Sequence, residues 1–246
     1  MFPLRDLSPT RGTAIVTITL IVINVLSFVA WQPHISADAE ASFLYQRAAV
    51  ACEITTRAPL TEVALASGAC SPTRGAPLFP DKGIALSILT SMFLHGGLLH
   101  LLGNMWFLWI FGDNVEEAFG RLGYLLLYVL AGVGATLGFT AVHPDSVEPL
   151  IGASGAIAGV LGAYLVLFPK GWVLALWVFW IIPVPALFFL GLWFVGQFGM
   201  AAPGVAWEAH VVGFLIGAIV ALVFRGRLLS GISAPTRQSP RAWRTS

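Results

Sequence analysis

The charged residues divide this sequence into long stretches that contain no Asp, Glu, Lys or Arg. Six stretches of 26, 30, 23, 21, 37 and 16 residues cover 12–37, 83–112, 122–144, 149–169, 171–207 and 209–224. About 20 apolar residues cross the hydrocarbon core of a bilayer as an α-helix. Lipid offers no partner for free backbone polar groups, so such stretches cross as helices. The pattern predicts an all-α polytopic membrane protein with six transmembrane helices in one domain, residues 1–246.

The composition excludes two other classes of protein. Only 10% of the residues are charged and 57% are hydrophobic, whereas roughly a quarter of a soluble domain is charged. A water-soluble enzyme is therefore excluded. The net charge of +1 comes without a long basic run, and nucleic-acid binding needs a concentrated positive face. We expect the lipid bilayer as a partner and no nucleic acid.

Three of the stretches need interpretation. The first stretch is longer than the 7–15-residue apolar core of a signal peptide, so residues 12–31 are predicted as the first span. Residues 83–112 would form a helix of about 45 Å, longer than the bilayer core of about 30 Å. Gly96 and Gly97 mark a break, with 83–95 dipping into the outer side and 97–113 as span two. Prolines at 183 and 185 divide the fifth stretch into a cytoplasmic-side segment, 171–183, and span five, 185–200.

The distribution of basic residues predicts the orientation, because Lys and Arg are retained on the cytoplasmic side. With the N-terminus inside, the outer segments hold four basic residues and the inner segments hold nine. The outer ones are Arg47, Arg57, Arg74 and Lys82; the inner ones are Arg5, Arg11, Arg121, Lys170, Arg225, Arg227, Arg237, Arg241 and Arg244. Both termini are therefore predicted to face the cytoplasm.

The segment 32–82 has the composition of a soluble protein and is predicted as an extracytoplasmic insert between helices 1 and 2. It contains both cysteines, Cys52 and Cys70. In an oxidising compartment this pair can form a disulfide, which contributes about 3 kcal/mol to stability. The alternative is two unrelated free thiols.

Polar side chains inside the predicted spans are costly in lipid, which makes them functional candidates. His100 and Asn104 are four residues apart and share one face of span two. Ser154 lies a few residues into span four, and His210 lies at the start of span six. Both spans run from outside to inside, so the two side chains are predicted at similar depth. Glycine faces at 155, 159 and 162 and at 213 and 217 would let the two helices approach closely.

These residue types together indicate acyl transfer. A serine hydroxyl needs a base within hydrogen-bond reach, and neutral imidazole supplies one. This predicts Ser154 and His210 as catalytic residues. The developing oxyanion needs donors, for which the Ser154 backbone N–H at a helix N-terminus, His100 and Asn104 are candidates. We expect no metal and no cofactor.

Four motifs carry a family resemblance. They are FLHGGLLHLLGN at 93–104, Gly112-x-x-x-Glu116-x-x-x-Gly120, Gly152-Ala153-Ser154-Gly155 and Ala209-His210-Val211-Val212-Gly213. In order, spacing and predicted side they resemble the rhomboid intramembrane serine proteases over 83–224, with 12–31 as the first helix. The resemblance implies a six-helix bundle with a cavity open to the outside. It also implies cleavage of single-pass transmembrane proteins within or near their membrane segment.

The resemblance assigns roles to individual residues. It implies that Ser154 is the nucleophile, that His210 is the general base and acid, and that His100 and Asn104 line the oxyanion hole with the Ser154 amide. It further implies a membrane-embedded loop at 83–95, a network around Glu116 that supports this loop, and a span five that moves to admit substrate.

One position departs from the family pattern. Some rhomboids place an aromatic residue one turn after the serine, where it packs on the catalytic imidazole. This chain has Ala158 there. The orientation of His210 is therefore expected to rest on other contacts.

Two alternatives remain. A transporter can also use intramembrane His and Asn, but it would place ionisable groups across the full depth of the membrane, whereas here they cluster in the outer third. A catalytically inactive relative that binds membrane proteins would typically lack Ser154 or His210. No presequence rich in Arg and Ser is present, so a bacterial plasma membrane is the expected location.

Overall fold

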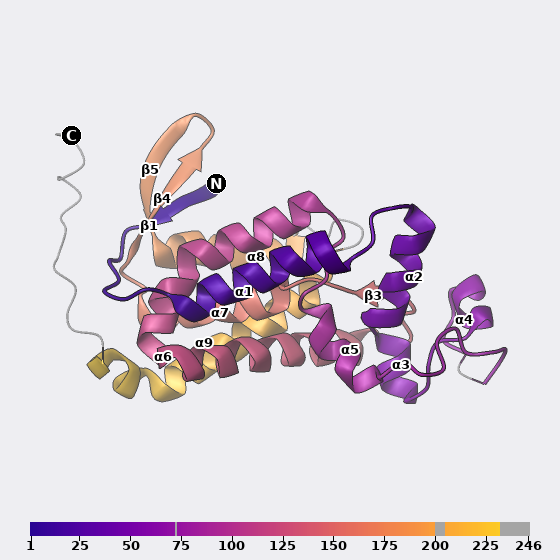
Figure 1. The fold of residues 1–246 in the computed structure, drawn as a ribbon. Helices are drawn as coiled ribbons and strands as arrows, with labels where there is room; N and C mark the ends of the chain where they lie inside the picture. Colours follow the sequence, from indigo (N-terminus) through magenta and orange to yellow (C-terminus); the bar gives the residue numbers. More distant parts are fainter. Residues whose placement is uncertain (72, 200–204, 232–246) are drawn as a thin grey trace.

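The computed structural model describes residues 1–71, 73–199 and 205–231 and is mostly helical (Figure 1). The helices are α1 (Ile15–Leu26) with its π-helical continuation η1 (Ser27–Trp31), α2 (Ala37–Arg47), α3 (Ala51–Thr56), α4 (Glu62–Ser67), α5 (Ile84–Ser91), α6 (Leu98–Val142), α7 (Ser154–Leu167), α8 (Ala186–Gly199) and α9 (Trp207–Gly231). The strands are β1 (Phe2–Asp6), β2 (Ala49–Val50), β3 (Pro149–Leu150), β4 (Trp172–Trp177) and β5 (Trp180–Pro185).

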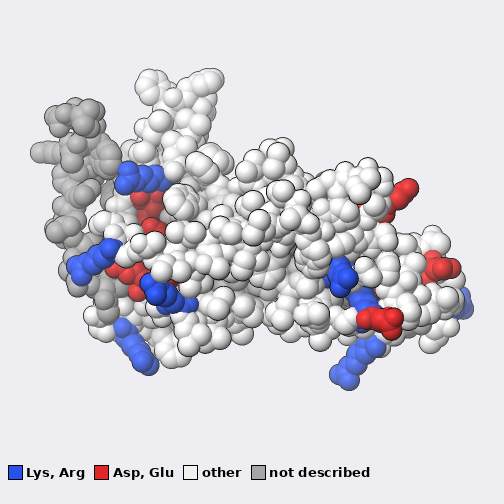
Figure 2. All heavy atoms as spheres, in the orientation of Figure 1, with Lys and Arg blue, Asp and Glu red and all other residues white. Residues whose placement is uncertain are grey.

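Among the described residues, two helices are long and apolar enough to cross a membrane, Leu98–Val142 and Trp207–Ser230. Shorter apolar helical segments cover Ile15–Trp31, Ser154–Leu167 and Ala186–Phe198. In Figure 2 the charged side chains gather at the two ends of the visible face, and the band between them carries none. Three of the basic residues predicted on the cytoplasmic side lie outside the described part of the chain, namely Arg237, Arg241 and Arg244.

The long helix α6 consists of two limbs that meet at Gly120. This residue has φ 70° and ψ 162°, a conformation that side-chain-bearing residues rarely adopt. The limbs 98–119 and 121–142 correspond to the predicted spans two and three, although the first limb is longer than expected. α6 begins directly after Gly97, as the sequence predicted.

Helices α7 and α9 pack backbone against backbone. A Cβ atom on Gly213 would lie 2.1 Å from the Gly155 carbonyl oxygen, and one on Gly217 would lie 1.8 Å from the Gly159 carbonyl oxygen. Only glycine fits such contacts, which are typical of close helix pairs in membranes. The described side chains of α7 are largely buried, so this helix forms the centre of the bundle.

The expectation of an all-α fold is wrong for residues 172–185. This segment forms an antiparallel hairpin, β4–β5, and β1 pairs with its β4 strand to give the sheet order β1-β4-β5. Pro183 and Pro185 lie on β5, an edge strand, where a missing N–H is tolerated. The tip projects away from the bundle (Figure 1) and exposes Phe179 and Trp180 by 89% and 73%.

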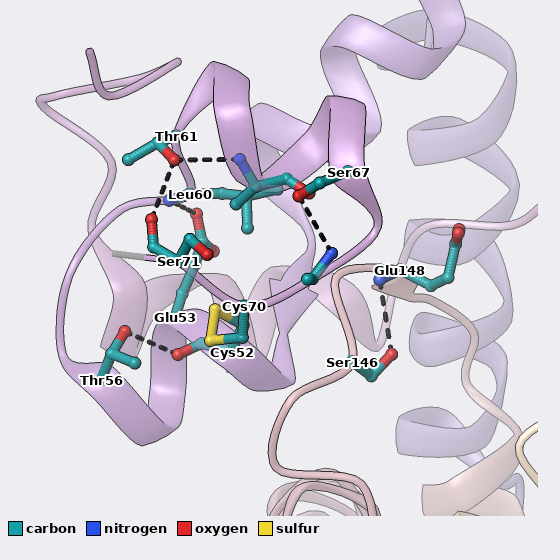
Figure 3. The surroundings of a disulfide bond; sticks show 12 residues. Cys52, Glu53, Thr56, Leu60, Thr61, Ser67, Cys70, Ser71, Ser146 and Glu148 are labelled. Atoms are coloured by element: carbon teal, nitrogen blue, oxygen red, sulfur yellow. Dashed lines mark hydrogen bonds between the residues drawn. A yellow bond between two sulfur atoms is a disulfide. The ribbon is translucent and has the colours of Figure 1, made fainter. Parts of the chain in front are cut away.

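The insert, residues 32–82, folds as short helices around a small core. Cys52 and Cys70 form a disulfide (Figure 3). The core includes Val147, which comes from the segment between α6 and α7. The carboxylate of Glu53 accepts a hydrogen bond from the Leu60 N–H at 2.9 Å and contacts the Lys82 ammonium at 2.5 Å. Burial lowers the pKa of Lys82, and the charge of Glu53 acts against this shift.

Glu116 anchors the first helix. Its carboxylate accepts hydrogen bonds from the backbone N–H groups of Val16 and Thr17 at 2.9 and 2.8 Å and from the Thr17 hydroxyl at 2.9 Å. N–H groups in the first turn of a helix have no partner within it, and the positive end of the dipole favours a carboxylate. Glu116 therefore holds the start of α1 and not the loop at 83–95.

Candidate active site

The hydroxyl of Ser154 and the imidazole of His210 meet at the starts of two adjacent helices. Ser154 is the first residue of α7 and His210 lies in the first turn of α9. The Ser154 Oγ atom lies 2.8 Å from the His210 Nε2 atom, within the range of a hydrogen bond. Ser154 starts its helix, instead of lying a few residues into it, because residues 149–153 form β3 and a turn.

The turn before Ser154 depends on Gly152. Its φ is 121°, and a Cβ atom here would lie 2.9 Å from the Nε2 atom of His100 and 3.5 Å from the Ser154 Oγ atom. Glycine is thus required both by the backbone conformation and by the space. The same geometry shows that His100 and Ser154 flank one point of the chain.

His100 and Asn104 line the same cavity as the Ser154–His210 pair. The cavity has a volume of about 590 Å³. The Asn104 side-chain amide donates to the His100 carbonyl oxygen at 3.0 Å, and its nitrogen carries a second hydrogen. Within the described residues neither side chain is hydrogen-bonded to Ser154, so their role as oxyanion donors stays a prediction.

The insert supports the segment that precedes the nucleophile. Strand β2 of the insert pairs with β3. Ser91, the last residue of α5, accepts a hydrogen bond from the Ala49 N–H on its hydroxyl at 2.6 Å and one from the Gly152 N–H on its carbonyl at 2.9 Å. The Cys52 N–H donates to the Ser146 carbonyl at 3.0 Å. The disulfide-bonded lobe and the loop before Ser154 are therefore one hydrogen-bonded unit.

Sequence reasoning missed Gln197 on α8. Its Oε1 atom lies 2.8 Å from the His210 Nδ1 atom. The indole of Trp193, one turn earlier on α8, is tilted by 36° with its centroid 6.3 Å from that of the imidazole. Gln197 lies in a stretch that was interpreted only as an apolar span. The signal available was an amide inside a membrane helix, which is a functional candidate in its own right.

The electrostatic surroundings of His210 contain few ionisable groups. His100 on α6 lines the same cavity as His210, and Glu208 lies two residues before it on α9. Glu208 is engaged elsewhere, because its carboxylate lies 2.7 Å from the His143 Nε2 atom. In the described part of the chain no cluster of three or more His, Cys, Asp or Glu side chains is placed to hold a metal ion.

The comparison with protein families identifies this fold and motif set. The model of the rhomboid domain matches residues 82–227, more than half of the chain. The chain therefore belongs to the rhomboid family and is a polytopic membrane protein, which confirms the resemblance seen in the motifs.

Several curated proteins are similar to this chain. Rhomboid protein 1, mitochondrial, of Saccharomyces cerevisiae is 34% identical over 148 residues, which cover 54% of this chain and 40% of the yeast protein. RHOMBOID-like protein 5 of Arabidopsis thaliana is 36% identical over 85 residues, 35% and 28% of the two chains. Rhomboid protease GluP of Bacillus subtilis is 41% identical over 78 residues, 32% and 15% of the two chains. The chain thus spans less than half the length of each of these relatives.

Proposed function

We propose that this protein is an intramembrane serine endopeptidase that cleaves single-pass transmembrane proteins within or near their membrane segment. The observation that carries the proposal is the 2.8 Å contact between the Ser154 Oγ and His210 Nε2 atoms. The pair lies in the wall of a cavity of about 590 Å³ that His100 and Asn104 also line. Membership of the rhomboid family supports it, as does the protease name of the Bacillus subtilis relative.

The proposed reaction uses the residues in the order that their contacts allow. The His210 Nε2 atom takes the proton of the Ser154 hydroxyl, and the Oγ atom attacks the carbonyl carbon of the scissile peptide. The Ser154 N–H, Asn104 and His100 stabilise the oxyanion. His210 then returns the proton to the leaving amine, and a water molecule from the outer side hydrolyses the acyl-enzyme in the same way.

The proposed membrane topology follows the apolar helical segments. The six spans are α1 with η1, the two limbs of α6, α7, α8 and α9. Both termini face the cytoplasm, and the insert and the cavity face outward, in a bacterial plasma membrane. The charge-free band of Figure 2 supports this topology, because charged side chains avoid the hydrocarbon core. The single domain covers 1–246, with residues 32–82 as its extracytoplasmic insert.

A labelling and cleavage experiment tests the proposed activity. The protein in liposomes is treated with a fluorescent fluorophosphonate, and cleavage of a single-pass transmembrane reporter is followed in parallel. We expect Ser154→Ala and His210→Ala to abolish both signals. Ser230→Ala is the matched control, because this exposed serine lies near the opposite end of α9. Labelling that persists in Ser154→Ala would assign the nucleophile to another residue.

The same preparation separates the alternatives. A wild-type protein that binds transmembrane segments but cleaves none would be a binding protein. One that moves protons or solutes across the liposome membrane would be a transporter. Comparing membrane-protein fragments released by cells with the wild-type chain and with Ser154→Ala would then identify the substrates.

A further inference from the structure

The side-chain amide of Gln197 bridges the imidazole of His210 and the backbone of α8. Its Nε2 atom donates to the Trp193 carbonyl oxygen at 3.0 Å, and its Oε1 atom lies 2.8 Å from the His210 Nδ1 atom. A carbonyl oxygen only accepts hydrogen bonds, so the NH₂ group must face Trp193. The amide oxygen therefore faces the imidazole, and this contact is a hydrogen bond only if Nδ1 carries the hydrogen.

That requirement selects one tautomer of His210. A neutral imidazole carries a single N–H. With the hydrogen on Nδ1, the Nε2 atom has a free lone pair directed at the Ser154 Oγ atom 2.8 Å away. This is the form that can accept the serine proton. The other tautomer would place an N–H toward the hydroxyl and leave two acceptors facing each other at Gln197.

We infer that Gln197 is a positioning residue that fixes the tautomer and the ring orientation of His210; the inference rests on the proposed peptidase function. It acts through His210 and does not touch the reacting atoms. When Nε2 takes the proton during turnover, the Gln197 oxygen continues to accept from Nδ1. A hydrogen bond to the charged form of a group stabilises that form.

The arrangement accounts for the departure at Ala158. Ala158 carries no ring to pack on the imidazole, and among the described residues the aromatic ring beside His210 is that of Trp193 on α8. The orienting contacts come instead from α8, where Gln197 and Trp193 lie one turn apart and both approach His210. The carboxylate of Glu208 is paired with His143. A neutral amide orients the ring without placing a carboxylate beside it, and a buried carboxylate would be costly to desolvate.

The test compares wild type with Gln197→Leu, which removes the acceptor, and Gln197→Glu, which keeps it and adds charge. The rate of fluorophosphonate labelling and the kcat and KM for reporter cleavage are measured from pH 5 to pH 9. For Gln197→Leu we expect labelling and kcat to fall about tenfold, the value of one hydrogen bond, with KM unchanged. For Gln197→Glu we expect labelling above that of Gln197→Leu and an acid limb moved upward by about one pH unit or more, because a carboxylate favours imidazolium.

Val195→Ala is the matched control, since Val195 is an exposed residue on the same helix, and we expect wild-type rates. Wild-type rates and pH profile in Gln197→Leu would overturn the inference. So would equal losses in both Gln197 variants with an unmoved pH profile, which would indicate a purely structural role.

The tautomer is also measured without any substrate. In protein labelled with ¹⁵N-histidine, we expect His210 to show a protonated Nδ1 and an unprotonated Nε2, and to become a mixture of tautomers in Gln197→Leu. A wild-type His210 protonated on Nε2 would overturn the inference whatever the activity. Failure of the wild type to cleave any reporter, with the expected tautomer present, would instead count against the peptidase function.

Discussion

The distance between Ser154 and His210 depends on the glycine contact between α7 and α9, which makes Gly213→Ala an informative perturbation. Gly213 lies three residues after His210, and its contact partner Gly155 directly follows Ser154. The new Cβ atom would lie 2.1 Å from the Gly155 carbonyl oxygen, whereas real Cβ atoms essentially never approach closer than 3.0 Å. The obstacle is backbone, so no side-chain rotation relieves it.

The two helices must therefore separate by at least about 1 Å at this level, which only brings the new Cβ atom to the 3.0 Å limit. The Ser154–His210 separation of 2.8 Å would then grow to about 3.8 Å, beyond a hydrogen bond. A misplacement of about 1 Å in an active site costs about 10²-fold in rate. Overpacking of this kind also lowers stability by about 1–3 kcal/mol.

The assay is the initial rate of reporter cleavage and of fluorophosphonate labelling in liposomes. We expect both to fall by about 10²-fold in Gly213→Ala. Gly226→Ala on the same helix is the control, because a Cβ atom there meets nothing within 4 Å, and its rates should stay within twofold of wild type. If Gly213→Ala kept its labelling rate within threefold of wild type, the glycine contact would not set the geometry of the pair.

Further predictions concern the insert, the oxyanion donor and the N-terminal strand. Cys52→Ser should lower cleavage and increase hydrogen exchange at β2 and β3, because the disulfide holds the lobe that pairs with the loop before Ser154; unchanged exchange at β3 would contradict that coupling. Asn104→Ala should reduce kcat by about 10²–10³-fold, typical of one oxyanion donor, with stability checked by thermal unfolding. Burial raises the pKa of Asp6 from 3.8 to about 6, so the folded state holds the proton more tightly than the unfolded chain. The attachment of β1 should therefore weaken as the pH rises from about 4 to about 6 and stay constant above that range. The pKa difference sets an upper limit of about 3 kcal/mol on this loss, and the loss is smaller than this limit because Asp6 is only half-buried. Hydrogen exchange of β1 measures the effect, and Asp6→Asn should remove the pH dependence.

The helical bundle was predictable because lipid imposes a strong signal on the sequence. Charge-free runs of sufficient length, a break at Gly97 and closely packed glycines on α7 and α9 can all be recognised without coordinates. Ser154 and His210 were singled out for the same reason, since polar groups in such runs are rare. Their depth followed from both helices running in the same direction.

The hairpin β4–β5 was not predictable from periodicity. A continuous apolar run can be a buried strand or a helix, and the sequence around Trp172 and Trp180 has no alternation to decide between them. Its wealth of aromatic and β-branched residues was the available clue. The partner strand β1 comes from the N-terminal end of the chain, and a local sequence pattern does not indicate a pairing between such distant segments.

The link from Gln197 to His210 was missed for a different reason. It joins two helices through one amide, and its geometry depends on how α8 packs against α9. The role of Glu116 was similarly misassigned, because it was taken from the family resemblance, whereas its carboxylate accepts hydrogen bonds from the first turn of α1. Contacts of this kind become visible only when tertiary packing is known.

The pairing of β2 with β3 has a practical consequence for anyone trimming this protein. A shortened version restricted to the family-matching residues 82–227 would lack β2, which pairs with β3, and the start of α1, which donates hydrogen bonds to Glu116. The four sequence motifs would all be present in such a fragment, whereas β2 and α1, which contact β3 and Glu116, would be absent. In this chain, a fragment that contains every motif is therefore not expected to keep the arrangement of the site.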